Sequence, residues 1–278
     1  IWVGLKNLNN NTPLSIISHS HNINSFPQAL KDKNVNIQND EDVLFEAKKI
    51  DPRCELKTFY LKPGEFIDAD AGAMNYMDSS IQISTQTGNI GRAFGRLFSG
   101  SSFFYNTFTN KGKKPAIINL SSVHPGNIGA FYLPKGQKIN VVSNSYICST
   151  KGMEITTNVR FGGLLLGYGL TFVDIEAKED GIVWVASFGN SIEKTIEPGN
   201  SIKVDNGILM AFDRNEGIHT NFVGGFTSTL FSGEGLVSKI ENNGNQPLKI
   251  WLQSRSQTAY LDYIKHKIGS RHGGRKSK

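Results

Sequence analysis

Carboxylates at alternate positions are the first groups in this sequence that could do chemistry. Asp68 and Asp70 form one such pair, and a second group comprises Asp174, Glu176, Glu179 and Asp180. Two neighbouring carboxylates can divide the acid and base roles of a catalytic site. Beside a glycine turn, however, this spacing is typical of the solvated face of a strand. The pattern therefore favours a structural role for both groups, and no catalytic residue is predicted.

The sequence holds fragments of a phosphate-binding and a metal-binding pattern, and neither is complete. Backbone amides near Gly88, Gly91 and Gly95 could cradle a phosphate, but a phosphate loop ends in Gly-Lys followed by Ser or Thr, and no such ending follows. His19 and His21 could hold a metal through both rings, yet no third ligand stands nearby. The sequence predicts no cofactor and no metal site.

The cysteines and two isolated histidines have simpler interpretations. Cys54 and Cys148 are the only cysteines, and no Cys-x-x-Cys occurs. We expect reduced, partly buried thiols, with a disulfide or a reactive thiol as the alternative. His124 and His219 stand apart from other chemical groups and are expected to be structural or exposed.

Positive charge is concentrated at the carboxyl end. The net charge is +6, and residues 265–278 carry six basic and no acidic side chains, which leaves 24 of each sign in the rest of the chain. A fold that neutralises many phosphates carries its charge on its own surface. Nucleic acid is therefore disfavoured as a partner. The basic tail is interpreted either as a weak contact for an anionic surface or as a solvated end.

One stretch of the chain occurs three times and predicts the fold. The copies are residues 61–78, 133–150 and 196–213. Each opens with an apolar residue (Leu61, Leu133, Ile196), continues with a turn glycine (Gly64, Gly136, Gly199), and then alternates apolar residues at period two. This order predicts strand, turn and strand in each copy. The expected fold class is all-β.

The repeat also defines the domain organisation. Residues 1–40 are an asparagine-rich extension, residues 41–257 form a triple-repeat β domain, and residues 258–278 hold a short helix and the basic tail. The repeats cover about 42–121, 122–188 and 189–257. Units of that size are too small to close separate cores, so we expect one body. The apolar stripe of the helix is expected to pack on its own domain rather than on a membrane.

These residues resemble a known family. The segments Pro63–Glu65 and Ala71–Met74, with the strand entries Gly100–Phe104 and Gly233–Val237, are similar to the mitochondrial-biogenesis family named for altered inheritance of mitochondria. That family is similar in fold to the tryptophan RNA-binding attenuation protein. The resemblance implies three attenuation-protein-like β units packed as one pseudo-threefold body, of β-sandwich or double-stranded β-helix type. It also implies a mitochondrial location associated with the inner membrane, the alternative being cytoplasmic. It supplies no catalytic residue.

Three glycine-rich apolar stretches form the candidate interaction end. If a pseudo-threefold axis relates the repeats, these stretches meet at one end of the body. The candidate residues are Arg92, Arg96, Leu97, Phe98, Arg160, Phe161, Leu164, Leu165, Leu166, Phe226, Leu230 and Phe231. They could dock on a partner subunit or a membrane, with the arginines beside anionic groups, or they could pack inward as a cap on the core. No run of about 20 apolar residues occurs, so a membrane contact would be peripheral.

The function expected from these patterns is that of a non-catalytic β scaffold. We expect a homo-oligomer that assembles through strand edges or the glycine-rich end, with peripheral contact to a membrane or membrane protein. The alternative is a small-molecule or RNA-binding module like the attenuation protein. Lys111, Lys113 and Lys114 form a basic turn in one repeat only, which disfavours a repeated RNA code.

Overall fold

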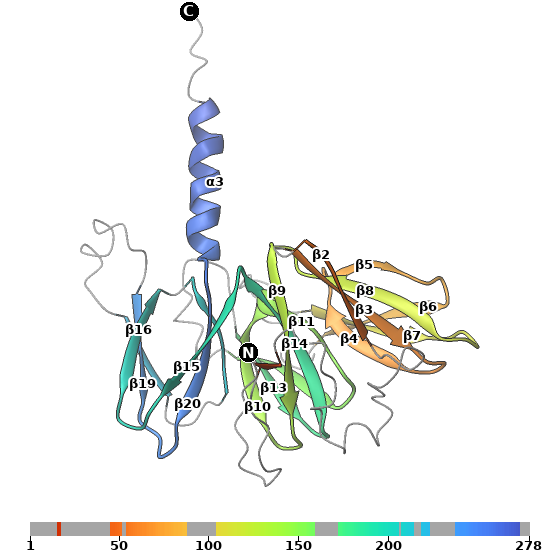
Figure 1. The fold of residues 1–278 in the computed structure, drawn as a ribbon, viewed down its shortest axis with the longest axis horizontal. Coiled ribbons are helices and arrows are strands. Elements are labelled where there is room, and N and C mark those ends of the chain that lie inside the picture. The colour runs from red at the N-terminus through yellow and green to blue at the C-terminus, as the bar shows by residue number, and fades with distance from the viewer. Residues whose placement is uncertain are drawn as a thin grey trace, which may run out of the picture.

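The computed structural model shows an all-β body followed by one C-terminal helix (Figure 1). The described residues are 16–17, 45–51, 54–87, 104–158, 172–205, 207–213, 218–222 and 237–272. Their strands form four antiparallel sheets. The predicted fold class is confirmed, and residues 42–121, 122–188 and 189–257 are called segments one, two and three below.

Each segment contains two groups of three paired strands, here called its first and second trio. In segment one, the first trio is β3 (Cys54–Leu61), β8 (Ala116–Ser121) and β5 (Met74–Met77). The second trio is β4 (Phe66–Asp70), β7 (Phe104–Asn110) and β6 (Ile81–Thr87). The central strand of each trio comes from the later half of the segment, so the pairing is non-local.

The other segments pair their strands in the same order. Segment two has the trios β9 (Gly126–Leu133), β14 (Gly181–Phe188), β11 (Tyr146–Ser149) and β10 (Lys138–Val142), β13 (Phe172–Ala177), β12 (Met153–Asn158). Segment three has β15 (Ser191–Ile196), β20 (Leu248–Gln253), β17 (Leu209–Phe212) and β16 (Ser201–Asp205), β19 (Val237–Asn242), β18 (Ile218–Phe222).

Neighbouring segments are joined edge to edge. β11 of segment two pairs with β4 of segment one, and β17 of segment three pairs with β10 of segment two. Two further strands extend the sheets: the two-residue β1 (Ile16–Ile17) pairs with β9, and β2 (Phe45–Asp51) at the start of segment one pairs with β3. Among the described strands, β5 and β16 end their sheets, and they lie at opposite ends of the body (Figure 1). The predicted pseudo-threefold closure is therefore not confirmed.

The predicted turn glycines adopt the expected backbone conformation. Gly64, Gly136 and Gly199 have φ of 81°, 87° and 76°, in the left-handed region that glycine enters without strain. Their amides donate to the carbonyls of Asn110 (2.8 Å), Ala177 (2.7 Å) and Asn242 (2.8 Å), which ties each turn to the end of a strand in the same segment.

Two of those strand ends carry a buried asparagine that ties down the next turn. The Asn110 side chain donates to the carbonyls of Leu61 and Lys114, both at 2.8 Å, and accepts from the Gly112 amide at 2.8 Å. Asn242 makes the corresponding three bonds in segment three. We call these two side chains the asparagine clamps.

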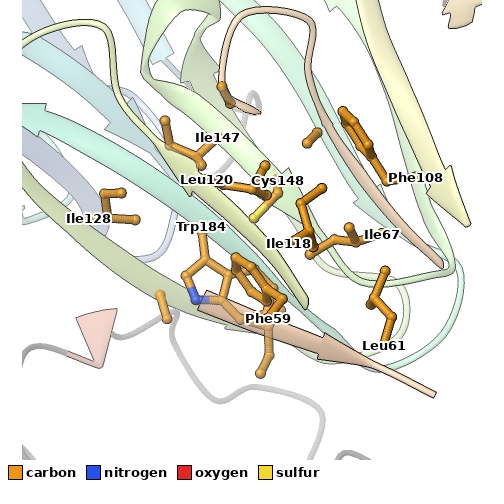
Figure 2. Packing of buried hydrophobic residues seen from close by; sticks show 14 of the residues in the cluster. Phe59, Leu61, Ile67, Phe108, Ile118, Leu120, Ile128, Ile147, Cys148 and Trp184 are labelled. Carbon is orange, nitrogen blue, oxygen red and sulfur yellow. The ribbon is translucent and has the colours of Figure 1, made fainter. Parts of the chain in front are cut away.

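Aromatic pairs fasten each segment to the next. The Phe59 and Trp184 rings are 4.9 Å apart at 87°, and Phe131 and Trp251 repeat that distance and angle. Figure 2 shows Trp184 of segment two packed beside Phe59 of segment one, in a core cluster that contains residues of both segments. Such edge-to-face pairs add roughly 0.5–1.5 kcal/mol beyond the burial of their area. The core is therefore continuous across both internal junctions.

The C-terminal helix α3 (Gln257–His272) confirms the predicted helix. Its start is held by a hydrogen bond from Asn144 to Gln257 and by Tyr260 against Phe188, with ring centroids 5.3 Å apart. Beyond that it projects from the body (Figure 1), and the side chains of Leu261 and Tyr263 are exposed. The prediction that its apolar stripe packs on the body is therefore wrong beyond the first turn. No helix in the described ranges is long and apolar enough to span a bilayer.

Candidate interaction surface

The predicted interaction end falls outside the described residues. Arg92, Arg96, Leu97, Phe98, Arg160, Phe161, Leu164, Leu165, Leu166, Phe226, Leu230 and Phe231 all lie in 88–103, 159–171 or 223–236. Each of those stretches joins two strands that pair directly: β6 with β7, β12 with β13, and β18 with β19. The three stretches thus join equivalent strand pairs. Whether they meet at one end of the body stays a prediction.

A partly buried polar cluster lies where segments one and two join. The Tyr146 hydroxyl donates to the Asp68 carbonyl at 3.0 Å and lies 2.9 Å from the Ser149 hydroxyl. The Thr107 hydroxyl donates to the Asp68 carboxylate at 2.5 Å. Burial raises the pKa of the Asp68 carboxyl and raises that of Tyr146 well above its usual value. The Tyr146–Asp68 bond joins β11 of segment two to β4 of segment one, and the Thr107–Asp68 bond joins β7 to β4 within segment one, so the cluster has a structural role.

The predicted carboxylate groups differ in exposure. Asp68 and Asp70 alternate with the buried residues Ile67 and Ala69, as expected, but both carboxylates are half-buried rather than freely solvated. Burial raises the pKa of Asp70 as well, and its carboxylate accepts a hydrogen bond from the Gly72 amide at 3.1 Å. Both carboxylates therefore bond within the fold.

The second carboxylate group is a surface ion-pair network. Glu176 lies 3.2 Å from Lys138 and 2.8 Å from Lys178, and Lys178 also contacts Glu154 at 2.7 Å. Hydrogen bonds from these two lysines lower the pKa of Glu176. Of this group, Glu176 is thus neutralised by two lysines on a partly exposed strand face, which agrees with the predicted solvated strand face.

Two further candidate groups are placed in packing roles. Cys148 is free and fully buried, and burial raises the pKa of its thiol well above the usual value, so the nucleophilic thiolate is suppressed. His124 is half-buried, its Nδ1 lies 3.1 Å from the Ser122 hydroxyl, and its ring packs against Phe188 with centroids 5.6 Å apart. Burial lowers the pKa of His124. The side chains of Cys54 and His219 lie outside the described set. Within that set, no three His, Cys, Asp or Glu side chains are grouped to hold a metal.

An exposed apolar sheet edge is the feature that the sequence interpretation missed. β5 ends its sheet, with Met74 37% and Tyr76 60% exposed. The equivalent strands β11 and β17 are buried at every position. One signal in the sequence marks the difference, because Tyr76 stands where the other copies have Cys148 and Ala211. A bulky aromatic residue replaces two small ones. We call β5, with these exposed side chains, the β5 edge.

Comparison with known proteins places the fold in a family context. The family described as mitochondrial biogenesis AIM24 matches residues 51–255. A crystal structure of a Streptococcus pyogenes protein is similar in fold with a TM-score of 0.62 and 20% identity, over 80% of this chain and 98% of that one. None of the curated proteins matches the sequence.

Proposed function

The chain belongs to the mitochondrial biogenesis AIM24 family, and from that premise we propose that it is a non-catalytic β scaffold that assembles with itself in mitochondria. The family description associates its members with mitochondrial biogenesis. The three segments serve as tandem repeats in this proposal, because their strands pair in the same order. The scaffold makes peripheral contact with the inner membrane or a protein of that membrane.

The observation that carries the proposal is the β5 edge. A sheet edge presents unpaired backbone donors and acceptors, and soluble proteins usually blunt such edges with charge, proline or a covering element. Here the edge bears Met74 and Tyr76, both exposed, and no charged residue lies among the four residues of the strand. An edge of this kind favours association with another strand.

The chemical groups described above also favour a scaffold over an enzyme. The thiol of Cys148 is buried, and the Asp68 carboxylate accepts a hydrogen bond from Thr107. Glu176 is neutralised by Lys138 and Lys178. Each of these groups is buried in the fold or bonded to a neighbouring side chain, which is the expected arrangement in a non-catalytic protein.

Light scattering coupled to size exclusion, with native mass spectrometry of the same full-length sample, tests the proposal. We expect a homo-oligomer without a stoichiometric small molecule. Tagged chain in fractionated cells is expected to sediment with mitochondria and to be released from their membranes by high salt or alkaline carbonate, as a peripheral protein is. A monomer that carries a bound small molecule would overturn the scaffold and favour a ligand-binding module.

A further inference from the structure

We propose that the β5 edge of one copy pairs with the β16 edge of a second copy, head to tail, in the register that joins the segments inside one chain. The inference rests on the self-assembly proposed above and assigns its interface. Two observations support this interface. Edge-to-edge pairing joins neighbouring segments at two internal junctions, and the strands equivalent to those at the junctions, β5 and β16, are at open edges.

The two internal junctions have the same register. At the first, Cys148 lies opposite Ala69 and Ser149 opposite Asp68. At the second, Ala211 lies opposite Val141 and Phe212 opposite Asn140. When the repeats are superposed on their opening residues, Cys148 and Ala211 take the same place, and so do Ala69 and Val141. The chain therefore uses one edge-to-edge joint twice.

A third joint of this kind is open at both of its edges. β5 is the counterpart of β11 and β17, and β16 is the counterpart of β4 and β10. In the described part of the chain, neither β5 nor β16 has a second neighbour. They lie at opposite ends of the body (Figure 1), so one chain cannot pair them with each other in this conformation. A second copy supplies the missing strand.

The shape of β5 matches that of the strands that are already joined. The pairing of β5 with β8 shifts register between Met74 and Tyr76. The same shift occurs between Tyr146 and Cys148 in β11, and between Leu209 and Ala211 in β17, at the equivalent places. A bulge bends and twists a strand locally. The open edge therefore has the local form that the two internal junctions use.

The internal register predicts the contacts between copies. Tyr76 takes the place of Cys148 and Ala211, and Val204 takes that of Ala69 and Val141. Tyr76 should therefore lie opposite Val204 of the second copy. By the same correspondence, Met77 should lie opposite Lys203. A shift of one residue would place these side chains on opposite faces of the sheet.

The joint between copies should be weaker than those within the chain. The internal junctions pack Trp184 on Phe59 and Trp251 on Phe131. At the third joint the corresponding residues are Asn119 and Lys194, so no such aromatic pair forms. We therefore expect assembly that depends on protein concentration, with the internal joints intact throughout.

Cysteine cross-linking between two differently substituted chains tests the register. Chains with Lys203→Cys are mixed with chains with Met77→Cys, oxidised, and separated on a non-reducing gel. Opposed residues of antiparallel strands lie about 4.5–5.5 Å apart at Cα, within the span of a disulfide. We expect a covalent dimer from this mixture and none from wild type or from either chain alone.

Lys203→Cys mixed with Tyr76→Cys is the matched control, because that pair is offset by one residue and should not cross-link. A product from Met77→Cys alone would indicate two β5 edges paired with each other and would overturn the head-to-tail joint. Equal amounts of cross-linked dimer from the Met77→Cys and Tyr76→Cys mixtures would also overturn the proposed register.

A charge placed on the edge separates failure of this inference from failure of the proposed function. Tyr76→Lys should raise the concentration of half-assembly roughly tenfold or more, because pairing would bury the charge. Tyr263→Lys is the control, since Tyr263 is 58% exposed and belongs to α3 rather than to either edge strand. If wild type stays monomeric at all concentrations, self-assembly itself is wrong. Suppose instead that wild type assembles, that Tyr76→Lys assembles equally well, and that no cross-link forms. In that case only the interface assigned here is wrong.

Discussion

Replacing the first asparagine clamp should weaken the fold by a measurable amount. Asn110→Ala removes two donors and one acceptor from a fully buried position. The bond to the Leu61 carbonyl is buried, so its loss leaves an unsatisfied acceptor that costs roughly 1–3 kcal/mol. The bonds to Lys114 and Gly112 are partly buried, where water can substitute, and cost roughly 0.5–1 kcal/mol each. The expected loss of unfolding free energy is about 2–5 kcal/mol.

Urea unfolding followed by tryptophan fluorescence measures this loss. Asn242→Ala should cause a similar one, because Asn242 makes the same three bonds in segment three. Asn75→Ala is the control: its bond to Ser121 is exposed, and its loss should change the unfolding free energy by about 0.5 kcal/mol or less. A loss below about 1 kcal/mol for Asn110→Ala, or one equal to that of Asn75→Ala, would refute the reasoning.

Three further predictions follow from burial and close packing. Asp68→Asn should raise the unfolding free energy at pH 7 by about 1 kcal/mol or less. Burial raises the folded-state pKa of this carboxyl above 3.8, so the contribution of Asp68 to stability falls as pH rises through that pKa. The stability gained by Asp68→Asn should therefore vanish in urea titrations below about pH 4. Gly126→Ala should cost about 3 kcal/mol or more, because its added Cβ would lie 1.7 Å from the Ser187 carbonyl oxygen; Gly64→Ala, strained at φ 81° but in open space, should cost about 1–2 kcal/mol by the same denaturation. Native Cys148 should resist a thiol reagent that labels it after unfolding, and equal labelling rates would contradict its burial.

The strands and turns were predictable because their signals are local. Ile139 and Val141 alternate in the sequence with the polar residues Lys138 and Asn140, and both apolar side chains are fully buried in β10. Gly136 precedes them with φ of 87°. Side-chain alternation and positive φ depend only on a few neighbouring residues, which is why three copies of one pattern were enough to predict the all-β fold.

The asparagine clamps were missed, although a signal for them exists. Asn110 precedes Gly112, and Asn242 precedes Gly244, at equivalent places in segments one and three. An asparagine two residues before a glycine is typical of a turn in which the side chain accepts from the glycine amide. One further bond reaches the carbonyl four residues later, and the other reaches the last residue of β3 or β15, 49 or 46 residues earlier in the chain. That distant acceptor could not be assigned without the three-dimensional arrangement.

The candidate interaction surface was predicted only in kind. Strand edges were expected to mediate assembly, but the residues named for docking belong to the glycine-rich stretches, which lie outside the described residues. The exposed edge with Met74 and Tyr76 was identified only when the burial of β5 was compared with that of β11 and β17. Apart from Tyr76 in place of the smaller Cys148 and Ala211, the apolar pattern of these strands is the same in sequence whether or not a neighbouring strand covers them.

The sequence by itself determined that each copy folds as strand, turn and strand, which side chains alternate and where the backbone needs glycine, because these depend on local sterics and on the period of two. Only the tertiary structure decided which edges meet. The pairing of Cys148 with Ala69, and the open ends at β5 and β16, join or separate residues far apart in the chain. An edge is paired when its backbone groups form hydrogen bonds with another strand, and it stays open when no strand lies beside it. No local pattern encodes which strand pairs there.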